Sequence, residues 1–346
     1  MKRLSIIASI AALALGMVSC QGQKAAPEVK PLTVKGTQLY AGDEPVTFKG
    51  ISFGWNNIWP RFYNAGAVKE LNEVWGSKIF RAAIAADDIA SADNPGIHEG
   101  YITDPEFARE TLYSVIDAAI VQGAYVIVDW HSHILYKDAA VRFFTEVASK
   151  YSGVPNVIYE LFNEPVCWSF EDGRENPYED LGNPDAMAQY WTDLKDYADA
   201  CIKAITSVTS NKPLILMGCP SWDQRIDLPV SDPVTSYDNL MYTVHFYAAT
   251  HKQSLRDATA AAYEAGLPIF ISECAACEAS GDGYLDEEEW KLWDEFCTER
   301  NISMMTWSIS DKVETCSMFI KEASSEGPWA DDVIKPWGKI VKDWAK

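Results

Sequence analysis

The chain has 346 residues, 48% of them hydrophobic, which is enough apolar content for one large buried core. Its 50 acidic residues outnumber 29 lysines and arginines, giving a formal net charge of −21. A surface of this sign repels nucleic acids and anionic membranes, so neither is expected as a partner, whereas a neutral substrate is unaffected.

Residues 1–20 predict an export signal rather than part of the fold. Lys2 and Arg3 precede an apolar run at 4–18 that is too short to span a membrane, and Cys20 follows. The pattern resembles a bacterial lipoprotein signal, in which acylated Cys20 would anchor the chain to the outer membrane or the cell surface. Ordinary signal cleavage, giving a periplasmic or secreted protein, is the alternative. Residues 21–32 are then a polar tether, and 33–346 form one domain.

Strand-like and helix-like segments alternate along the rest of the chain. A short hairpin at 39–42 and 45–52 leads into a first strand; seven further apolar runs predict strands at 78–84, 124–130, 156–162, 214–218, 240–246, 268–273 and 302–307. Helices are predicted at 67–75, 105–122, 139–151, 184–208, 254–265, 290–300 and 333–344, with no clear helix between the fifth and sixth strands. This alternation predicts a single α/β domain, a parallel (β/α)8 (TIM) barrel.

The cysteines do not predict a disulfide framework. Seven follow Cys20, an odd number scattered through a large chain: Cys167, Cys201, Cys219, Cys274, Cys277, Cys297 and Cys316. Cys274 and Cys277 form a C-x-x-C pair, but no second pair and no nearby histidine accompanies them. Buried, incidental cysteines are therefore expected rather than a metal site, although one local disulfide remains open in an exported protein.

Polar and aromatic residues gather where the predicted strands end. Glu164 closes a mostly apolar run bounded by Pro155 and Pro165, and Glu273 closes another. The remaining strand-end residues are Arg81, His131, Asn163, His245, Tyr247 and Trp307. In a barrel the C-terminal strand ends meet at one rim, where barrel enzymes carry their chemistry. We therefore predict that Glu164 and Glu273 face each other as a carboxylate pair.

Six short sequences at these positions resemble those of glycoside hydrolase family 5, most closely its bacterial endoglucanase (cellulase) branch. They are IFRA at 79–82, VIVDWH at 126–131, VIYELFNEP at 157–165, HFYA at 245–248, IFISE at 269–273 and WSISDK at 307–312. The resemblance spans about residues 33–325. It implies a catalytic domain that hydrolyses internal β-1,4 bonds of a β-glucan polysaccharide or oligosaccharide with retention of configuration, without a metal or other cofactor. We expect a monomer.

The resemblance also implies roles for individual residues. Glu164 would be the general acid and base and Glu273 the nucleophile, with carboxyl groups ~5–5.5 Å apart. The charge of Glu273 should raise the pKa of Glu164, and Arg81 should hold Glu273 ionised. Asn163 would bind the sugar's 2-hydroxyl. The other supporting roles are a donor to the nucleophile from Tyr247, orientation of the acid and the sugar by His131 and His245, a flat face from Trp307 and a sugar donor from Lys312.

Several expectations stay open. Trp59, Trp168 and Trp222 lie in strand-end loops, where they either extend the sugar platform or pack in the scaffold. Asn56 stands where related enzymes often carry a histidine. The same mechanism could act on mannan, xyloglucan or mixed-linkage β-glucan. Two less favoured alternatives are a non-catalytic surface glycan-binding lipoprotein and a metal-dependent barrel hydrolase whose ligands are Asp129, His131 and His133.

Overall fold

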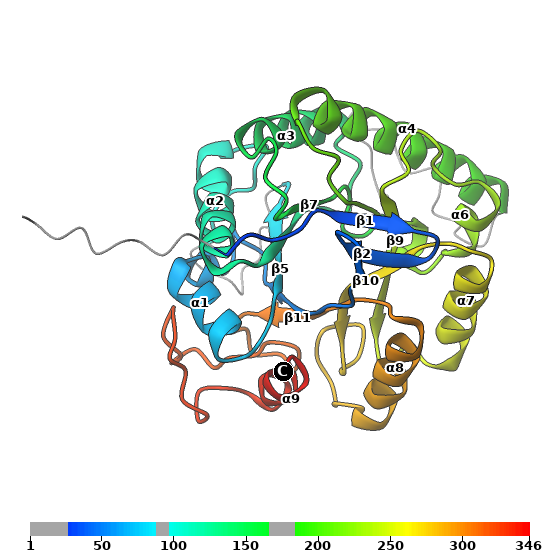
Figure 1. Cartoon of the computed structure of the whole chain (residues 1–346). Coiled ribbons are helices and arrows are strands. Elements are labelled where there is room, and N and C mark those ends of the chain that lie inside the picture. Colours follow the sequence, from blue (N-terminus) through cyan, green and yellow to red (C-terminus); the bar gives the residue numbers. More distant parts are fainter. Residues whose placement is uncertain (1–26, 88–96, 166–183) are drawn as a thin grey trace, which may run out of the picture.

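Eight parallel strands close into a barrel in the computed structural model, which describes residues 27–87, 97–165 and 184–346 (Figure 1). The strands are β4 (Lys49–Phe53), β5 (Ile79–Ala85), β6 (Tyr125–His131), β7 (Val157–Glu160), β8 (Ile215–Met217), β9 (Leu240–Tyr247), β10 (Ile269–Ala275) and β11 (Met304–Ile309). Each strand pairs with its neighbours in chain order, and β11 returns to β4. The predicted (β/α)8 barrel is confirmed.

Helices form a ring around the barrel (Figure 1). They are α1 (Ala65–Glu73), α2 (Pro105–Gln122), α3 (Lys137–Lys150), α4 (Pro184–Val208), α7 (Gln253–Glu264), α8 (Glu287–Arg300) and α9 (Pro336–Trp344), with a 3₁₀ turn η1 (Pro60–Phe62) before α1. Only the short α5 (Pro220–Asp223) and α6 (Asp227–Ser231) lie between β8 and β9, as the sequence indicated. None of the described helices combines the length and apolar character needed to cross a membrane.

Local sequence sets the bounds of α2. The Asp104 side chain accepts a hydrogen bond from the Phe107 N–H at 3.1 Å, which satisfies one of the free donors of the first turn. Pro105 stands at the first helical position, where its missing N–H costs nothing. The helix ends at Gly123, whose φ of 63° is the left-handed conformation that glycine adopts without steric penalty. These signals explain why the predicted and observed bounds coincide.

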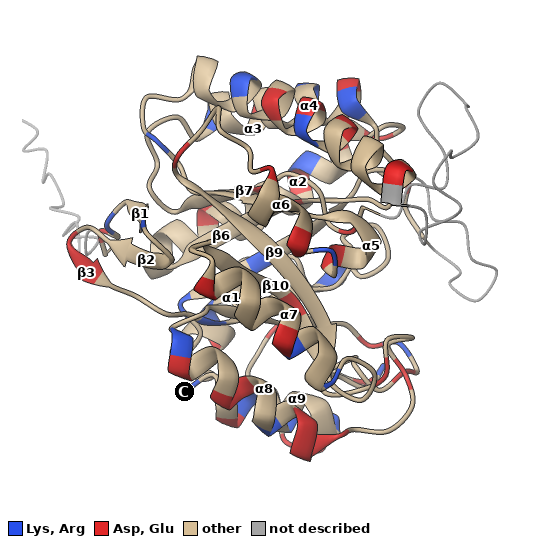
Figure 2. Cartoon of the chain, turned by 90° about the vertical axis from the view of Figure 1, so that its right-hand side faces the viewer, with Lys and Arg blue, Asp and Glu red and all other residues tan. Residues whose placement is uncertain are grey.

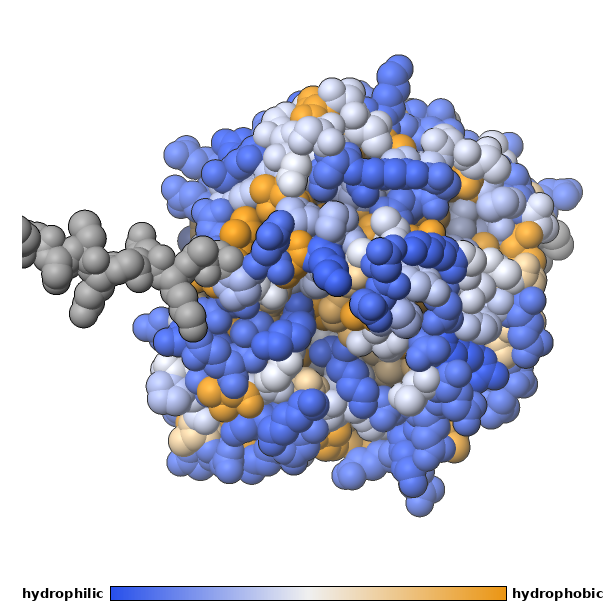
Figure 3. Space-filling model, in the orientation of Figure 1, coloured by the Kyte–Doolittle hydropathy of each residue, from blue (hydrophilic) through white to orange (hydrophobic). Residues whose placement is uncertain are grey.

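The predicted N-terminal hairpin is a three-stranded antiparallel sheet of β1 (Leu32–Lys35), β2 (Gln38–Ala41) and β3 (Glu44–Pro45). Leu32 and Leu39 pack on residues at the start of barrel strands, including Ile79 and Tyr125. The sheet therefore covers the N-terminal end of the barrel, and Figure 2 shows it at the end opposite to α5. The surface around it is mainly hydrophilic with scattered hydrophobic residues (Figure 3).

The barrel strands are buried along their whole length apart from Lys49, the first residue of β4. Every residue of β5, β6, β9 and β10 is buried, because the strands face the barrel interior on one side and the helices on the other. Burial of this kind explains the apolar runs that identified the strands. It also makes the charged residues inside them informative, because a buried charge must be paired.

Candidate active site

Arg81 on β5 is the centre of a charge cluster inside the barrel. Its side chain is fully buried. Nε donates to Glu160 Oε2 at 2.7 Å, Nη2 to Asn163 Oδ1 at 2.7 Å and Nη1 to Glu273 Oε2 at 2.9 Å. Nη2 also lies 2.9 Å from Asp129 Oδ2. Burial alone would lower the pKa of Arg81, but the surrounding carboxylates outweigh it and raise the pKa, so the guanidinium stays charged.

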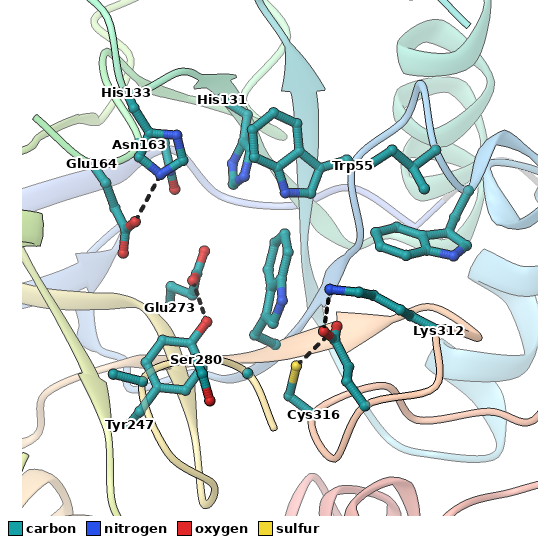
Figure 4. Close-up of a pocket in the computed structure, with 16 residues that line it drawn as sticks. Trp55, His131, His133, Asn163, Glu164, Tyr247, Glu273, Ser280, Lys312 and Cys316 are labelled. Atoms are coloured by element: carbon teal, nitrogen blue, oxygen red, sulfur yellow. Dashed lines mark hydrogen bonds and ion pairs between the residues drawn. The ribbon is translucent and has the colours of Figure 1, made fainter. Parts of the chain in front are cut away.

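Glu273 on β10 is held at both carboxylate oxygens. Arg81 binds Oε2, and the Tyr247 hydroxyl donates to Oε1 at 2.7 Å, a contact visible in Figure 4. Burial raises the pKa of Glu273 and the nearby charge of Glu164 raises it further, while His245 and Arg81 lower it; the result is a raised pKa. Arg81 therefore acts on the pKa of Glu273 in the predicted direction, but burial and Glu164 outweigh its effect.

Glu164 follows β7 and contacts two histidines. Its Oε2 lies 3.1 Å from His133 Nε2 (Figure 4), and its Oε1 lies 3.0 Å from His245 Nδ1. Burial would raise the pKa of Glu164, but the hydrogen bonds to the two imidazoles outweigh burial and lower it well below its usual range. The prediction that Glu273 raises this pKa in the resting site is therefore wrong, because the histidines lie closer and act more strongly.

The backbone after β7 brings Asn163 and Glu164 to the rim. The predicted strand at 156–162 is too long, since β7 ends at Glu160. Two further backbone hydrogen bonds nevertheless tie the chain to the end of β6: Asn163 N–H to Trp130 O at 3.1 Å and Glu164 N–H to Ser132 O at 3.3 Å. One carboxylate oxygen of Glu164 and one of Glu273 thereby lie within 4.8 Å of each other.

His131 lies at the end of β6, where it was expected, and its ring nitrogen contacts Asp129 rather than Glu164. Its Nδ1 lies 2.6 Å from Asp129 Oδ2, and its ring is parallel to that of Trp307 at a centroid distance of 5.3 Å. The Trp55 ring is nearly perpendicular to it at a centroid distance of 4.1 Å. Burial, followed by the charge of Arg81, lowers the pKa of His131 and keeps it neutral. Glu164, the predicted acid, is contacted by His245 and not by His131, which lies against Trp55 and Trp307.

The alternative metal-ligand set is not gathered in the structure. Asp129 pairs with Arg81 and His131, whereas the His133 ring turns to Glu164. The carboxylate oxygens of Glu164 and Glu273 are likewise occupied by hydrogen bonds to protein side chains. Glu164, His245 and Glu273 are the one trio among the described residues whose ligand atoms lie within 4.8 Å of one another, and side-chain hydrogen bonds already join them to each other and to their neighbours.

Two cavities meet at Glu164. The first has a volume of about 410 Å³ and contains Glu273; its wall includes Trp55, Trp59, His131, Asn163, Trp307 and Lys312. The second has a volume of about 640 Å³; its wall includes Ser221, Trp222, Gln224, His245 and His251. His133, Glu164 and Tyr247 line both. Together the cavities form a cleft that continues on either side of the carboxylate pair.

The remaining predicted residues all line this cleft. Trp59 and Trp307 are largely buried in the wall of the first cavity. Lys312 Nζ pairs with Glu314 Oε2 at 2.5 Å, so its ammonium is held at the edge of the same cavity. Trp222 lines the second cavity. Predictions that fall on Cys20, Cys167 and Trp168 lie outside the described residues.

Asn56 belongs to the scaffold, and so do the described cysteines apart from Cys316, which lines the first cavity (Figure 4). Asn56 Nδ2 donates to Thr111 Oγ1 at 2.9 Å, and its Oδ1 accepts from the Ala85 N–H at 2.8 Å, so it does not replace an active-site histidine. The six cysteines among the described residues are free and buried. Cys274 Sγ donates to the Met305 carbonyl at 3.3 Å, consistent with the incidental role predicted for the C-x-x-C pair.

Sequence reasoning missed four residues of the site. Glu160 binds Arg81 in bidentate fashion, and a charged residue inside an apolar strand was the available signal. His133 was assigned only to the metal alternative, although its position two residues after His131 places it near the same rim. Trp55 and Asp223 carry no local signal, because only the fold brings them to His131 and His245.

The chain is similar to cellulases in sequence and structure. The family model described as cellulase (glycosyl hydrolase family 5) matches residues 39–313. Endoglucanase Z of Dickeya dadantii is 34% identical over 330 residues, covering 92% of this chain and 70% of the relative. An endoglucanase of Clostridium saccharobutylicum is 34% identical over 319 residues, covering 90% of this chain and 64% of the relative.

Solved structures extend the similarity. The catalytic domain of Thermobifida fusca endoglucanase Cel5A superposes with a TM-score of 0.77 at 26% identity, over 91% of this chain and 96% of that one. A structure from Cytophaga hutchinsonii gives 0.78 at 34% identity, over 92% and 94%. The chain thus spans nearly the whole of these solved domains, but only 70% and 64% of the two sequence relatives.

Proposed function

The chain belongs to glycosyl hydrolase family 5, the cellulase family, and is a glycoside hydrolase; from this premise we propose that it is a retaining endo-β-1,4-glucanase acting on cellulose-type glucans. The spacing of the two carboxylates carries the proposal. Oxygens of Glu164 and Glu273 lie within 4.8 Å of each other. Retaining enzymes hold their carboxyls ~5–5.5 Å apart, whereas inverting enzymes leave ~6.5–9.5 Å for a water molecule.

Each carboxylate then has a defined step. A Glu273 oxygen attacks the anomeric carbon and forms the glycosyl ester, while the bond to the leaving oxygen breaks and that oxygen takes the proton of Glu164. In the second step water attacks the same carbon, its proton passes to Glu164, and the Glu273 carboxylate leaves. Arg81 and Tyr247 donate to Glu273 and stabilise the charge that it regains.

Because its pKa is low, Glu164 is ionised in the resting site, and the imidazoles next to it supply the proton for the leaving oxygen. The pKa values of His133 and His245 are both raised: burial lowers each of them, but the carboxylates around them outweigh it. Each ring nitrogen lies 3.0–3.1 Å from a Glu164 oxygen. A proton on either imidazole can therefore move to Glu164 as the glycosidic oxygen becomes basic in the transition state.

The two cavities support cleavage inside a chain. Glu273 lies in the first cavity, so this side holds the sugar that becomes covalently bound, with Asn163 beside it for the 2-hydroxyl. Glu164 faces both cavities, and the second one extends past the leaving oxygen towards Trp222. Room for sugars on both sides of the carboxylate pair is what an endo-acting enzyme requires. Aromatic faces in each cavity suit the apolar faces of pyranose rings.

A product profile tests the proposal. Wild type should release reducing sugar from carboxymethylcellulose faster than from mannan, xyloglucan or barley β-glucan, and NMR should detect the β-anomer first. Glu273→Gln should abolish glycosyl-ester formation with 2,4-dinitrophenyl β-cellobioside. Glu164→Gln should still form the ester, because this leaving group needs no proton, and azide should accelerate its turnover. An α-anomer as first product, or near-native turnover of carboxymethylcellulose by either variant, would refute the mechanism.

We also propose that Cys20 is lipidated and that the enzyme is an exported outer-membrane or cell-surface lipoprotein. The support is the signal-like sequence of residues 1–20 alone. Mass spectrometry of the mature N-terminus should find an acylated cysteine, and Cys20→Ser should move the activity from the membrane fraction to the soluble one. An unmodified N-terminus beyond Cys20 would contradict the anchor.

A further inference from the structure

Asp223 is a buried carboxylate that is linked to Glu164 through one residue, His245. It ends α5 and is fully buried. Oδ1 accepts a hydrogen bond from the Cys219 N–H at 2.6 Å. Oδ2 lies 3.2 Å from His245 Nε2 and has no hydrogen-bond partner in good alignment among the described residues. The opposite ring nitrogen, Nδ1, contacts Glu164 Oε1 at 3.0 Å.

The backbone that presents Asp223 is in an unfavourable conformation. Ser221, Trp222 and Asp223 have φ values of 60°, 54° and 61°, so α5 is a left-handed turn made of residues that carry a Cβ atom. Such conformations persist only where the surrounding contacts impose them, and they cluster at functional sites. Here Ser221 N–H bonds to Pro165 O at 3.1 Å, next to Glu164. The turn directs Asp223 to His245 and places Trp222 on the cleft wall.

His245 faces several other charged groups, but those on the Nε2 side already have partners. Glu160 on β7 lies 3.8 Å from Nε2 and is bound by Arg81, as is Glu273 on β10. Asp129 on β6 pairs with Arg81 and His131. The charge of His245 also lowers the pKa values of His131 and His251. No lysine or arginine among the described residues pairs with Asp223.

We propose that Asp223 is a positioning residue for the acid and base step: it fixes the proton on the Nε2 side of His245, so that Nδ1 remains a donor to Glu164. The inference rests on the proposed function. A proton between Oδ2 and Nε2 can sit on either atom, and in both cases Nδ1 keeps its own hydrogen. Nε2 is also 2.9 Å from Ser272 Oγ, a neutral group that fixes the ring plane but adds no charge. Two protons shared by His245 and Asp223 are what this requires: Nδ1–H then donates to Glu164 whether the second proton lies on Nε2 or on Oδ2, whereas a single proton on Nε2 would leave Nδ1 an acceptor.

Electrostatics agree with this geometry. Burial lowers the pKa of His245, and Asp223 leads the groups that outweigh burial and raise it. Burial in turn raises the pKa of Asp223, which favours sharing of the proton between the two groups. Removing the negative charge of Asp223 makes the loss of a proton from the Glu164–His245 pair easier, wherever that proton resides. The pKa that ends activity on the alkaline side should therefore fall.

Asp223→Asn tests this with little change in size. We expect the alkaline limb of the kcat/KM profile on a soluble cellodextrin to move to lower pH by about one unit or more. KM should change little, because Asp223 lies behind His245 rather than on the cleft surface. With 2,4-dinitrophenyl β-cellobioside, whose departure needs no proton, the rate of glycosyl-ester formation should stay close to wild type. Asp227→Asn is the matched control: this carboxylate pairs with Arg225 at the surface, so its profile should not move.

Two results would overturn the inference. One is an Asp223→Asn profile that drops equally at every pH with an unshifted alkaline limb, which is the signature of a purely structural role. The other comes from wild type and does not depend on the variant folding: ¹⁵N NMR of labelled histidines, with the His245 signal assigned by its loss in His245→Gln, would find Nδ1 unprotonated at neutral pH. Absence of turnover by wild type on both substrates would instead refute the proposed function.

Discussion

Replacing Arg81 by methionine removes the arginine that binds three carboxylates inside the barrel, one of them Glu273, the proposed nucleophile. Methionine keeps much of the apolar stem but loses every contact to Glu160, Asp129 and Glu273, all of them buried. Removing one member of a buried ion pair costs about 3–5 kcal/mol, because the other charge is left without a partner. Three carboxylates share this arginine, so we expect the upper end, about 5 kcal/mol at neutral pH. Domains are typically stable by only ~5–15 kcal/mol, so the variant should be close to unfolding.

The loss should shrink as the pH falls. In wild type, burial raises the pKa of Glu160 but Arg81 outweighs it and lowers the pKa, so this group stabilises the fold above its unfolded pKa and less as pH falls. Without Arg81, burial raises the pKa of the same carboxyl above its unfolded value. It then favours the fold at low pH and less as pH rises. Both effects reduce the difference between the proteins as pH drops through the carboxyl range near about 4.

Urea denaturation at neutral and at acidic pH measures the free energy of unfolding of wild type and of Arg81→Met, and their difference at each pH is compared. The control is Arg225→Met, which removes an equally bidentate arginine from Asp227, but at the surface, where the side chains are 34% and 60% exposed. An exposed pair contributes about 0–1 kcal/mol. If Arg81→Met were no less stable than the control at neutral pH, or if its deficit grew on acidification, the argument for a single buried anchor would be refuted.

Three further outcomes are expected. Trp59→Ala should raise KM for an aryl β-cellobioside, because Trp59 lines the first cavity. Trp222→Ala should leave that KM unchanged and slow the cleavage of cellodextrins, because Trp222 lines the second cavity. The same effect from both variants would contradict the assignment of the cavities. Dialysis against a chelator should leave hydrolysis unchanged, since protein hydrogen bonds occupy both carboxylates; loss of activity restored by a metal would contradict this. In a Cys20→Ser, Cys167→Ser background, a thiol reagent should label no cysteine before urea is added, because the six others are buried.

The barrel could be predicted from the sequence because each strand is buried on both faces and reads as an apolar run. The ends were less predictable: β7 ends at Glu160, yet the apolar residues Leu161 and Phe162 continue the pattern into irregular backbone. Apolar residues indicate burial rather than strand geometry, so an apolar run in the sequence can extend beyond the end of the strand. The carboxylate pair was predictable for a topological reason, since parallel strands deliver their C-terminal ends to one rim.

The contacts around the pair could not be predicted in the same way. Asp223 is an ordinary acidic residue in the sequence, and Glu160 stands out only as a charge within an apolar run; their partners, His245 and Arg81, come from other elements. The pKa of Glu164 shows the consequence. The prediction considered one neighbour, Glu273, and obtained the wrong direction, because two imidazoles at hydrogen-bond distance dominate the site.

The balance of charge at the rim explains why the acid cannot be treated as an isolated group. Arg81 neutralises part of the charge on Asp129, Glu160 and Glu273, but it does not contact Glu164 or Asp223. Buried carboxylates without cations are costly, so protons must make up the difference. His245 lies between the two remaining carboxylates and His133 contacts the outer oxygen of Glu164, which places those protons on imidazoles one hydrogen bond from the acid. The apparent pKa values of the reaction then belong to the whole group, and changing any member should move the profile of all of them.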